Sequence, residues 1–306
     1  MATLTVHLFG RLAISCDGAA INGLVSRKVQ ELLCYLILHR HRPHQRECLA
    51  STLWSNTPTA QSRANLRKVL WKLQSVFSDA GAVAPIAIGG EWIQVGTEGG
   101  VWCDVSELEL AFQQVTGAAS DAISEACAQR AEQAIGLYRG ELLEGWYQDW
   151  CLFERERLQN IYLALLDKLM AYYERRGQLE AAIAHGNTIL RYDRARELTH
   201  RHLMRLLVLA GDRTGALRQY ERCAHIMREE LDTGPSEPTL ALFEQIRADR
   251  SPASYGPATD ELLRAQSHLE SLLPRLAQLQ RESAAIWGEM KESLHAIEHI
   301  LNGHPH

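Results

Sequence analysis

The chemistry that this sequence could support is concentrated in a predicted helix over residues 59–77, TAQSRANLRKVLWKLQSVF. One side of this helix is apolar, because four large side chains recur at helical spacing: Leu66, Leu70, Leu73 and Phe77. At about 100° per residue, the other side collects small, polar, aromatic and cationic side chains: Ala64, Asn65, Arg67, Lys68, Trp71, Lys72 and Ser75. Lysine and arginine neutralise phosphates and asparagine reaches base edges, so this face suits a nucleic acid. The same pattern also fits an ordinary solvated surface helix.

The elements around this helix favour the nucleic-acid interpretation. A shorter helix is predicted over residues 46–54, and the turn SNTP separates it from the longer one. The segment PIAIGGEWIQV at 85–95 then predicts a β-hairpin, because two successive glycines supply the positive φ that a tight turn needs. Helix, turn, helix and hairpin in this order predict a winged helix-turn-helix with double-stranded DNA as its partner.

Charge is distributed unevenly along the 306 residues, whose formal net charge is −5. Residues 1–103 contain ten Lys and Arg against six Asp and Glu, a net charge of +4. Residues 104–306 contain 22 against 31, a net charge of −9. A basic N-terminal third on an acidic body fits a protein that binds a polyanion through one end.

Cysteine usage and the lack of targeting signals predict a cytoplasmic protein. The seven cysteines form no CxxC pair and their number is odd, which argues against a zinc site or a disulfide framework. The first residues contain no basic segment followed by an unbroken apolar run, so no signal peptide is expected. No stretch of 18 apolar residues exists, and therefore we expect no membrane contact.

Motifs for catalysis or cofactor binding are missing from the sequence. There is no GxxxxGK[ST] segment, and no Ser/His/Asp or Cys/His set can be singled out. The histidines of HRHRPH at 39–44 suit the end of a helix better than a metal site. We therefore expect no enzymatic activity, no cofactor and no metal.

The predicted fold is mainly α, with three parts. Residues 1–103 form a winged helix-turn-helix (α+β), with two strands between Thr3 and Ser15, a third near Ala20–Leu24 and a helix over 27–40. Residues 104–248 form an all-α, tetratricopeptide-like helical-repeat domain. Its predicted helices span 105–115, 122–138, 149–176, 179–192, 195–210, 214–230 and 239–248. A linker at 249–258 precedes a C-terminal coiled-coil-like helix at 259–301.

The repeat interpretation depends on a period of 34 residues. Gly177 and Gly211 are separated by this distance, and each lies between two predicted helices. Ala182 and Ala216 repeat with the same period, where two helices must approach closely. This length and this placement of small residues are typical of tetratricopeptide repeats.

Residues 260–301 show a sustained heptad pattern, with ten apolar residues in twelve core positions. A coiled coil that pairs two chains would give a homodimer, since paired half-sites raise the affinity of small DNA-binding proteins. A single amphipathic helix that folds back on the repeats fits the pattern equally well.

Several segments resemble one family, the Streptomyces antibiotic regulatory proteins (SARPs). Four segments resemble the N-terminal half of that family: VHLFGRLAIS, SRKVQELLCYLILH, RECLASTLW and ANLRKVLWKLQ. Five further segments resemble the bacterial transcriptional activator domain of the family: VWCDVSELE, AIGLYRGELLEGWYQDW, FERERLQNIYLALLDKL, ELTHRHLMRLLVLAGDRTGALRQYERC and PSEPTLALFEQI. The match covers residues 3–246 in a single order.

The resemblance implies an OmpR-type winged helix that binds direct repeats near promoters, and a helical domain that helps recruit RNA polymerase. Its recognition helix corresponds to residues 59–78. The residues that it implies for DNA contact are Arg63, Asn65, Arg67, Lys68 and Lys72, with Arg27 and Arg46 near helix starts for phosphates. The chain departs from the family in its wing, which contains Glu91 and Trp92 but no Lys or Arg. Trp71 has three open roles: stacking on sugar, packing at the edge of the core, or contacting a partner.

The sequence also fits two other functions. The missing cations of the wing favour a protein-interaction scaffold whose winged helix does not bind DNA. An effector-sensing regulator is the other, with an anion site on the repeats that would draw on Arg175, Arg176, Arg191, Arg194 and Arg196. The sequence does not name the effector.

Overall fold

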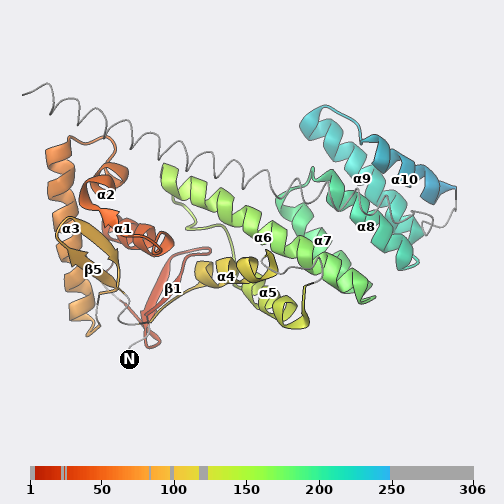
Figure 1. Ribbon diagram of the computed structural model, residues 1–306. Coiled ribbons are helices and arrows are strands. Elements are labelled where there is room, and N and C mark those ends of the chain that lie inside the picture. The colour runs from red at the N-terminus through yellow and green to blue at the C-terminus, as the bar shows by residue number, and fades with distance from the viewer. Residues whose placement is uncertain are drawn as a thin grey trace, which may run out of the picture. The chain divides into compact units, whose positions relative to one another are not determined.

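The computed structural model describes residues 4–21, 24, 26–82, 84–96, 100–116 and 123–248. The chain forms two compact units that divide after Gly234. The fold is mainly α, as predicted, with a small β component near the N-terminus (Figure 1). The linker at 249–258 and the heptad helix at 259–301, with its predicted dimer, lie outside the described residues.

The N-terminal part contains two small sheets and three helices. One sheet has the order β3-β2-β1-β7 and contains β1 (Leu4–His7), β2 (Ala13–Cys16), β3 (Ala19–Ala20) and β7 (Val101–Cys103). The other has the order β4-β6-β5 and contains β4 (His44–Gln45), β5 (Ile86–Gly89) and β6 (Trp92–Val95). The helices are α1 (Arg27–Leu38), α2 (Arg46–Leu53) and α3 (Thr59–Asp79). This order of helices and strands is that of a winged helix-turn-helix.

The two sheets agree with the predicted strands in part. The predicted hairpin forms between β5 and β6, with Ile86 opposite Val95. Of the two glycines expected to supply positive φ, Gly90 does so and Gly89 does not. The third N-terminal strand was predicted at 20–24, but β3 ends at Ala20. Asp17 and Gly18 both adopt positive φ, so pairing with β2 resumes at once at Ala19. Strand β7 was not predicted, because it has only three residues and pairs in parallel with β1.

The winged helix has an apolar core between its helices and sheets. The stripe predicted on α3 is buried, since Leu66, Leu70, Leu73 and Phe77 are at most 4% exposed. The core side of α1 contributes Val29, Leu32, Leu33, Leu36 and Ile37. Burial of this stripe fixes the rotation of α3 about its axis, and thereby decides which of its side chains face solvent.

The next helices form a helical-repeat domain up to Gly234. They are α4 (Asp104–Thr116), α5 (Glu125–Leu137), α6 (Asp149–Arg175), α7 (Leu179–Tyr192), α8 (Glu197–Leu209) and α9 (Arg213–Leu231). Gly177 and Gly211 adopt φ of 71° and 82° at the two predicted turns, a conformation that favours glycine. Ala182 and Ala216 are fully buried, as the close approach of the repeats requires. The second unit contains α10 (Glu237–Arg247).

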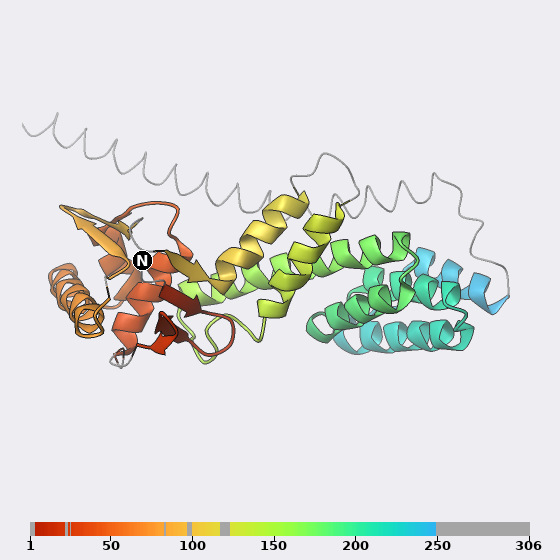
Figure 2. The ribbon, with the colours of Figure 1, turned by 90° about the horizontal axis from the view of Figure 1, so that it is seen from below.

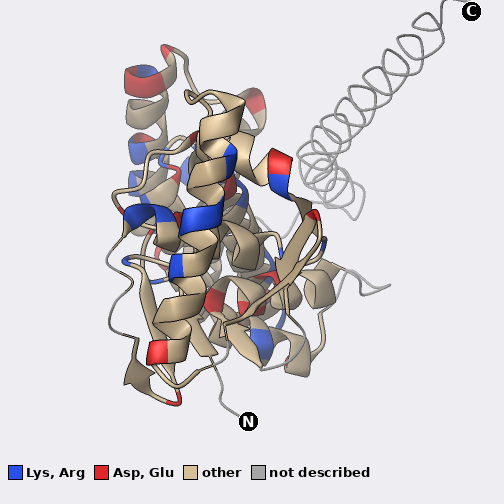
Figure 3. Cartoon of the chain, turned by 90° about the vertical axis from the view of Figure 1, so that its left-hand side faces the viewer, with Lys and Arg blue, Asp and Glu red and all other residues tan. Residues whose placement is uncertain are grey.

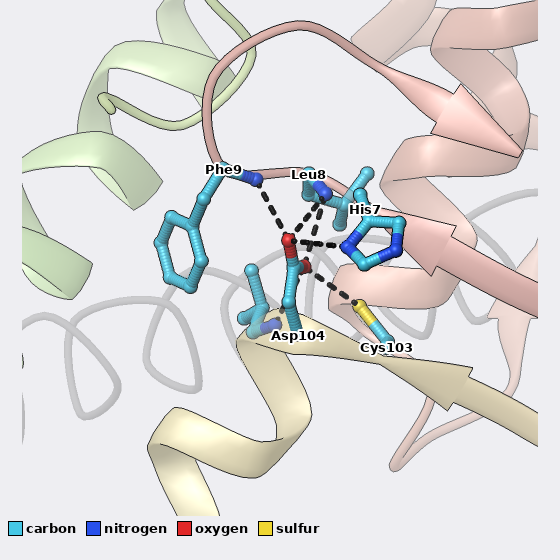
Figure 4. A network of polar contacts seen from close by, with 6 residues as sticks. His7, Leu8, Phe9, Cys103 and Asp104 are labelled. Atoms are coloured by element: carbon cyan, nitrogen blue, oxygen red, sulfur yellow. Dashed lines mark hydrogen bonds and ion pairs between the residues drawn. The ribbon is translucent and has the colours of Figure 1, made fainter. Parts of the chain in front are cut away.

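A buried carboxylate joins the winged helix to α4. Both Asp104 side-chain oxygens accept hydrogen bonds from Leu8 N–H, at 2.9 and 3.0 Å, and Phe9 N–H donates to Oδ2 at 3.1 Å. Val105 N–H at the start of α4 donates to Oδ1 at 2.8 Å. Figure 4 shows the carboxylate among these groups, with His7 and Cys103 beside it. Burial raises the pKa of Asp104 above its ordinary value even though the amide hydrogen bonds favour the charged form.

The segment between α5 and α6 also joins these two parts. Phe9 forms a β-bridge with Leu142, and Leu143 N–H donates to Leu8 O at 2.8 Å. Arg155 of α6 holds the segment from its other side, because its guanidinium donates to the carbonyls of Leu142, Leu143 and Trp146 at 3.0–3.2 Å.

Helix α1 contributes two further contacts. The Arg27 guanidinium lies 3.8 Å from the Trp146 ring centroid and donates to Gly145 O at 3.0 Å. Glu31 is 1% exposed and accepts a hydrogen bond from Trp150 Nε1 at 3.3 Å. We call these contacts of Asp104, Arg155, Arg27 and Glu31 the joint.

The predicted division at residues 103/104 stays a prediction, since residues on both sides of it lie in one compact unit. Among the described helices, none combines the length and the apolar character that crossing a membrane requires.

Candidate nucleic-acid interface

Helix α3 presents a cationic face to solvent on the outer side of the winged helix. In both Figure 1 and Figure 2, α3 lies on the side that faces away from α6. Figure 3 faces this side, and blue segments repeat along the helix. Arg67, Lys68, Trp71 and Lys72 are exposed and together line a shallow hollow. We call these four residues and Asn65 the recognition face.

The cations of the recognition face have no partners among the residues that the structure describes. Within the described ranges, no hydrogen bond or ion pair engages the side chains of Arg67, Lys68 or Lys72. Cations that the fold itself does not use are available to an anionic ligand, and three of them on about one and a half turns of helix attract a polyanion.

Asn65 is half-buried, and its Oδ1 accepts a hydrogen bond from Gln61 Nε2 at 3.1 Å. Arg63 is exposed but forms an ion pair with Glu47 of α2, so this guanidinium contacts the preceding helix. Such exposed pairs contribute at most about 1 kcal/mol, and a phosphate could therefore compete with Glu47 for Arg63.

Arg46 lies next to the recognition face and Arg27 does not. A second hollow is lined by Arg46, Arg67, Leu70, Trp71, Gln74 and Ile88, and it lies between α3, the start of α2 and β5. The Nε atom of Arg46 is buried and has no hydrogen-bond partner within the described part of the chain. The structure places the Arg27 guanidinium instead at the joint, on Trp146 and Gly145. The resemblance had implied a phosphate contact for Arg27 from its place near a helix start.

The wing is held close to the start of α2. Arg46 N–H donates to Glu91 O at 2.9 Å, and β4 pairs with β6. Trp92 is 48% exposed on this hairpin. The wing thus offers an aromatic surface and one carboxylate where a basic residue would be expected to meet a phosphate.

Sequence reasoning missed Gln74, which is exposed and lines the second hollow with Arg67 and Trp71. Its side chain can donate to and accept from a base edge. The helical spacing of the sequence indicates this position, since Gln74 follows Leu70 by four residues and Trp71 by three.

Three of the five arginines proposed for an anion site on the repeats form ion pairs within the fold. Arg196 pairs with Asp167 at 2.6 Å, Arg194 with Glu230 at 3.2 Å and Arg176 with Glu125 at 3.7 Å. These pairs use the guanidinium groups within the fold and so weaken the case for an anion site there. No group of His, Cys, Asp and Glu able to hold a metal occurs among the residues that the structure describes.

Comparison with known proteins agrees with the order of the helices and strands described above. Residues 103–247 match the family model described as the bacterial transcriptional activator domain. The transcriptional regulatory protein EmbR of Mycobacterium tuberculosis is 23% identical over 257 residues, and the match covers 79% of this chain. EmbR of Mycobacterium bovis matches to the same extent. The match spans 63% of the length of these relatives.

A solved structure supports the fold. Mycobacterium tuberculosis EmbR, in complex with a low-affinity phosphopeptide, matches with a TM-score of 0.64 and 20% sequence identity. The match covers 90% of this chain and 72% of that chain. Residues 103–247 therefore match the bacterial transcriptional activator domain, within a chain that is similar to SARPs.

Proposed function

We propose that this protein is a DNA-binding transcriptional regulator, most simply an activator, whose helix α3 enters the major groove of double-stranded DNA. The observation that carries the proposal is the recognition face, where Arg67, Lys68 and Lys72 are exposed and have no partner within the described part of the chain. The winged helix around α3 has the element order of a DNA-binding motif, and the match to a bacterial transcriptional activator domain supports a role at promoters.

In this proposal, phosphate contacts supply most of the affinity and base contacts supply the specificity. Lys68, Lys72 and Arg46 are placed to neutralise phosphates beside the groove. Arg67 and Asn65 carry the planar donor groups that recognise guanine and adenine edges. Arg63 would exchange its Glu47 partner for a phosphate.

The activator domain would contact RNA polymerase once α3 has bound beside a promoter. The joint supports this role, because Asp104 and Glu31 connect the helical domain to the winged helix through buried or partly buried hydrogen bonds. Arg155 holds the segment that contains Leu142 and Leu143, and this segment contacts the winged helix. A rigid connection would place a polymerase contact at a constant distance from the operator. We propose a binding protein without catalytic activity that acts in the cytoplasm, where its seven free thiols would stay reduced.

The proposal is tested by selecting DNA from a randomised pool with the full chain at two salt concentrations and sequencing the retained fraction. We expect an enriched, repeated motif and a steep loss of binding at the higher salt concentration. Retention without enrichment would reduce the proposal to nonspecific electrostatic binding. A lack of retention at low salt would contradict it and would favour the protein-interaction scaffold.

A further inference from the structure

Trp71 is the most unusual side chain of the recognition face. It is 71% exposed in the middle of α3, although indole is large and apolar and is usually found at least partly buried. No aromatic ring and no cation packs against it within the described residues. The fold therefore does not use this ring for its own stability.

The neighbours of Trp71 indicate which kind of surface would cover it. Arg67 and Lys68 lie one helical turn before it on the same side, and Lys72 follows it directly. The indole forms a wall of both hollows of this surface. No other large apolar residue of α3 is strongly exposed, so the ring is a single apolar group in a cationic surface. An apolar protein partner would bury these cations at a cost, whereas a polyanion would pair with them.

The major groove of DNA presents one apolar group, the 5-methyl group of thymine. We infer that Trp71 determines specificity in the DNA complex by packing its indole against thymine methyl groups, while Arg67, Lys68 and Lys72 bind the phosphates and bases around it. This inference rests on the proposed function and predicts that the operator contains thymine where Trp71 contacts it. Among the three roles open for Trp71 from the sequence, the exposure of the ring excludes packing at the edge of the core.

Uracil gives a direct test, because it differs from thymine only by the missing methyl group. The operator is first obtained by selection from the randomised pool, and each of its thymines is then replaced singly by deoxyuridine. For the wild-type full chain, we expect about fourfold weaker binding at one or more positions, which corresponds to loss of one buried methyl group. For Trp71→Ala, thymine and uracil should bind equally at those positions. Trp71→Phe retains an apolar ring and should preserve the preference for thymine.

Trp92→Ala is the matched control, since it removes an exposed tryptophan from the wing of the same domain. It should leave the thymine preference unchanged. Equal binding of thymine and uracil operators by the wild-type chain would overturn the inference while leaving DNA binding intact. An undiminished preference in Trp71→Ala would overturn it as well. A failure of the wild-type chain to select any sequence would instead contradict the proposed function itself.

Discussion

The recognition face and the joint use charged and polar side chains in opposite ways. At the joint, Asp104 is 1% exposed and accepts hydrogen bonds from three backbone amides, and Arg155 donates to three carbonyls. On the recognition face, Lys68 and Lys72 are exposed, and the described fold gives them no partner. The joint therefore contributes to folding, while the recognition face has groups left for a ligand.

This contrast has a physical reason. A buried charge is costly unless hydrogen bonds compensate for its lost hydration, so the joint must satisfy its polar groups internally. An exposed lysine is fully hydrated and needs no partner, and it can exchange water for phosphate when DNA arrives. Substitutions at the joint should thus alter the free energy of unfolding, and substitutions on the recognition face should alter binding.

The largest effect on stability is expected for Asp104→Ala. This change leaves the amides of Leu8, Phe9 and Val105 buried without an acceptor, and each such donor costs about 1–3 kcal/mol. We expect the free energy of unfolding to fall by about 3 kcal/mol or more, measured by urea denaturation. Asp104→Asn keeps one oxygen acceptor and should lose less. A loss below about 1 kcal/mol in Asp104→Ala would show that the joint is not a main source of stability.

The second-largest effect on stability is a pH dependence of the free energy of unfolding, caused by His39. Burial, together with the nearby His44 and Arg42, lowers the pKa of His39 from 6.5 to about 4. The unfolded chain then binds more protons than the folded chain between these values, so stability is present above pH 6.5 and is lost as the pH falls toward 4. Between pH 7 and pH 5, we expect His39 to lower the free energy of unfolding by about 2 kcal/mol.

The variant His39→Gln removes this titration, and its stability should change less than that of the wild type over the same interval. Urea denaturation of both proteins at pH 7 and pH 5 measures the difference. Identical pH dependence in the two proteins would assign the acid sensitivity to other groups. Buried His200, whose pKa burial also lowers, is one of them.

Arg27→Ala should have a smaller effect on stability and little effect on DNA binding. It removes the contact with the Trp146 ring and the hydrogen bond to Gly145 O, together worth about 1 kcal/mol. Arg11→Ala, which removes another exposed arginine of the winged helix, provides the control for lost charge. A strong loss of DNA affinity with unchanged stability would restore the phosphate contact that the family resemblance implied for Arg27.

The smallest effect on stability is expected for Lys68→Ala combined with Lys72→Ala. Both side chains are exposed, so the free energy of unfolding should change by less than about 0.5 kcal/mol. Urea denaturation of the double variant measures this. A clear destabilisation would mean that the two lysines support the fold, and the contrast between the recognition face and the joint would fail.

The two regions also differ in how far the sequence could predict them. The recognition face follows from the local periodicity of α3, because burial of Leu66, Leu70, Leu73 and Phe77 determines which residues face solvent. The joint connects segments that are distant in the chain: Asp104 accepts a hydrogen bond from Leu8 N–H, and Glu31 accepts one from Trp150. No local pattern reveals such pairs, and Asp104 looked like an ordinary acidic residue at a helix start.

Two of the DNA-contact residues show the same limit. Arg63 belongs to the cationic side of α3, but its ion pair with Glu47 depends on the angle between α2 and α3. Arg27 lies at a helix start, where a phosphate contact is reasonable, but its guanidinium packs on Trp146, which lies more than one hundred residues later in the chain. Helix spacing predicts which side chains share a face. Only the tertiary structure shows which of these side chains already contact other residues of the fold.

The salt dependence of DNA binding tests the central claim most directly. The dissociation constant of the full chain for its selected operator would be measured at several salt concentrations. The measurement would include the wild type, the double variant Lys68→Ala/Lys72→Ala, and a control, Arg218→Ala/Arg222→Ala. The control removes two exposed cations at the same i, i+4 spacing from α9.

If Lys68 and Lys72 each neutralise a phosphate, the slope of log affinity against log salt should become shallower by about two in the first variant. The slope of the α9 control should equal that of the wild type. Equal slopes in all three proteins would contradict the assignment of DNA binding to the outer face of α3.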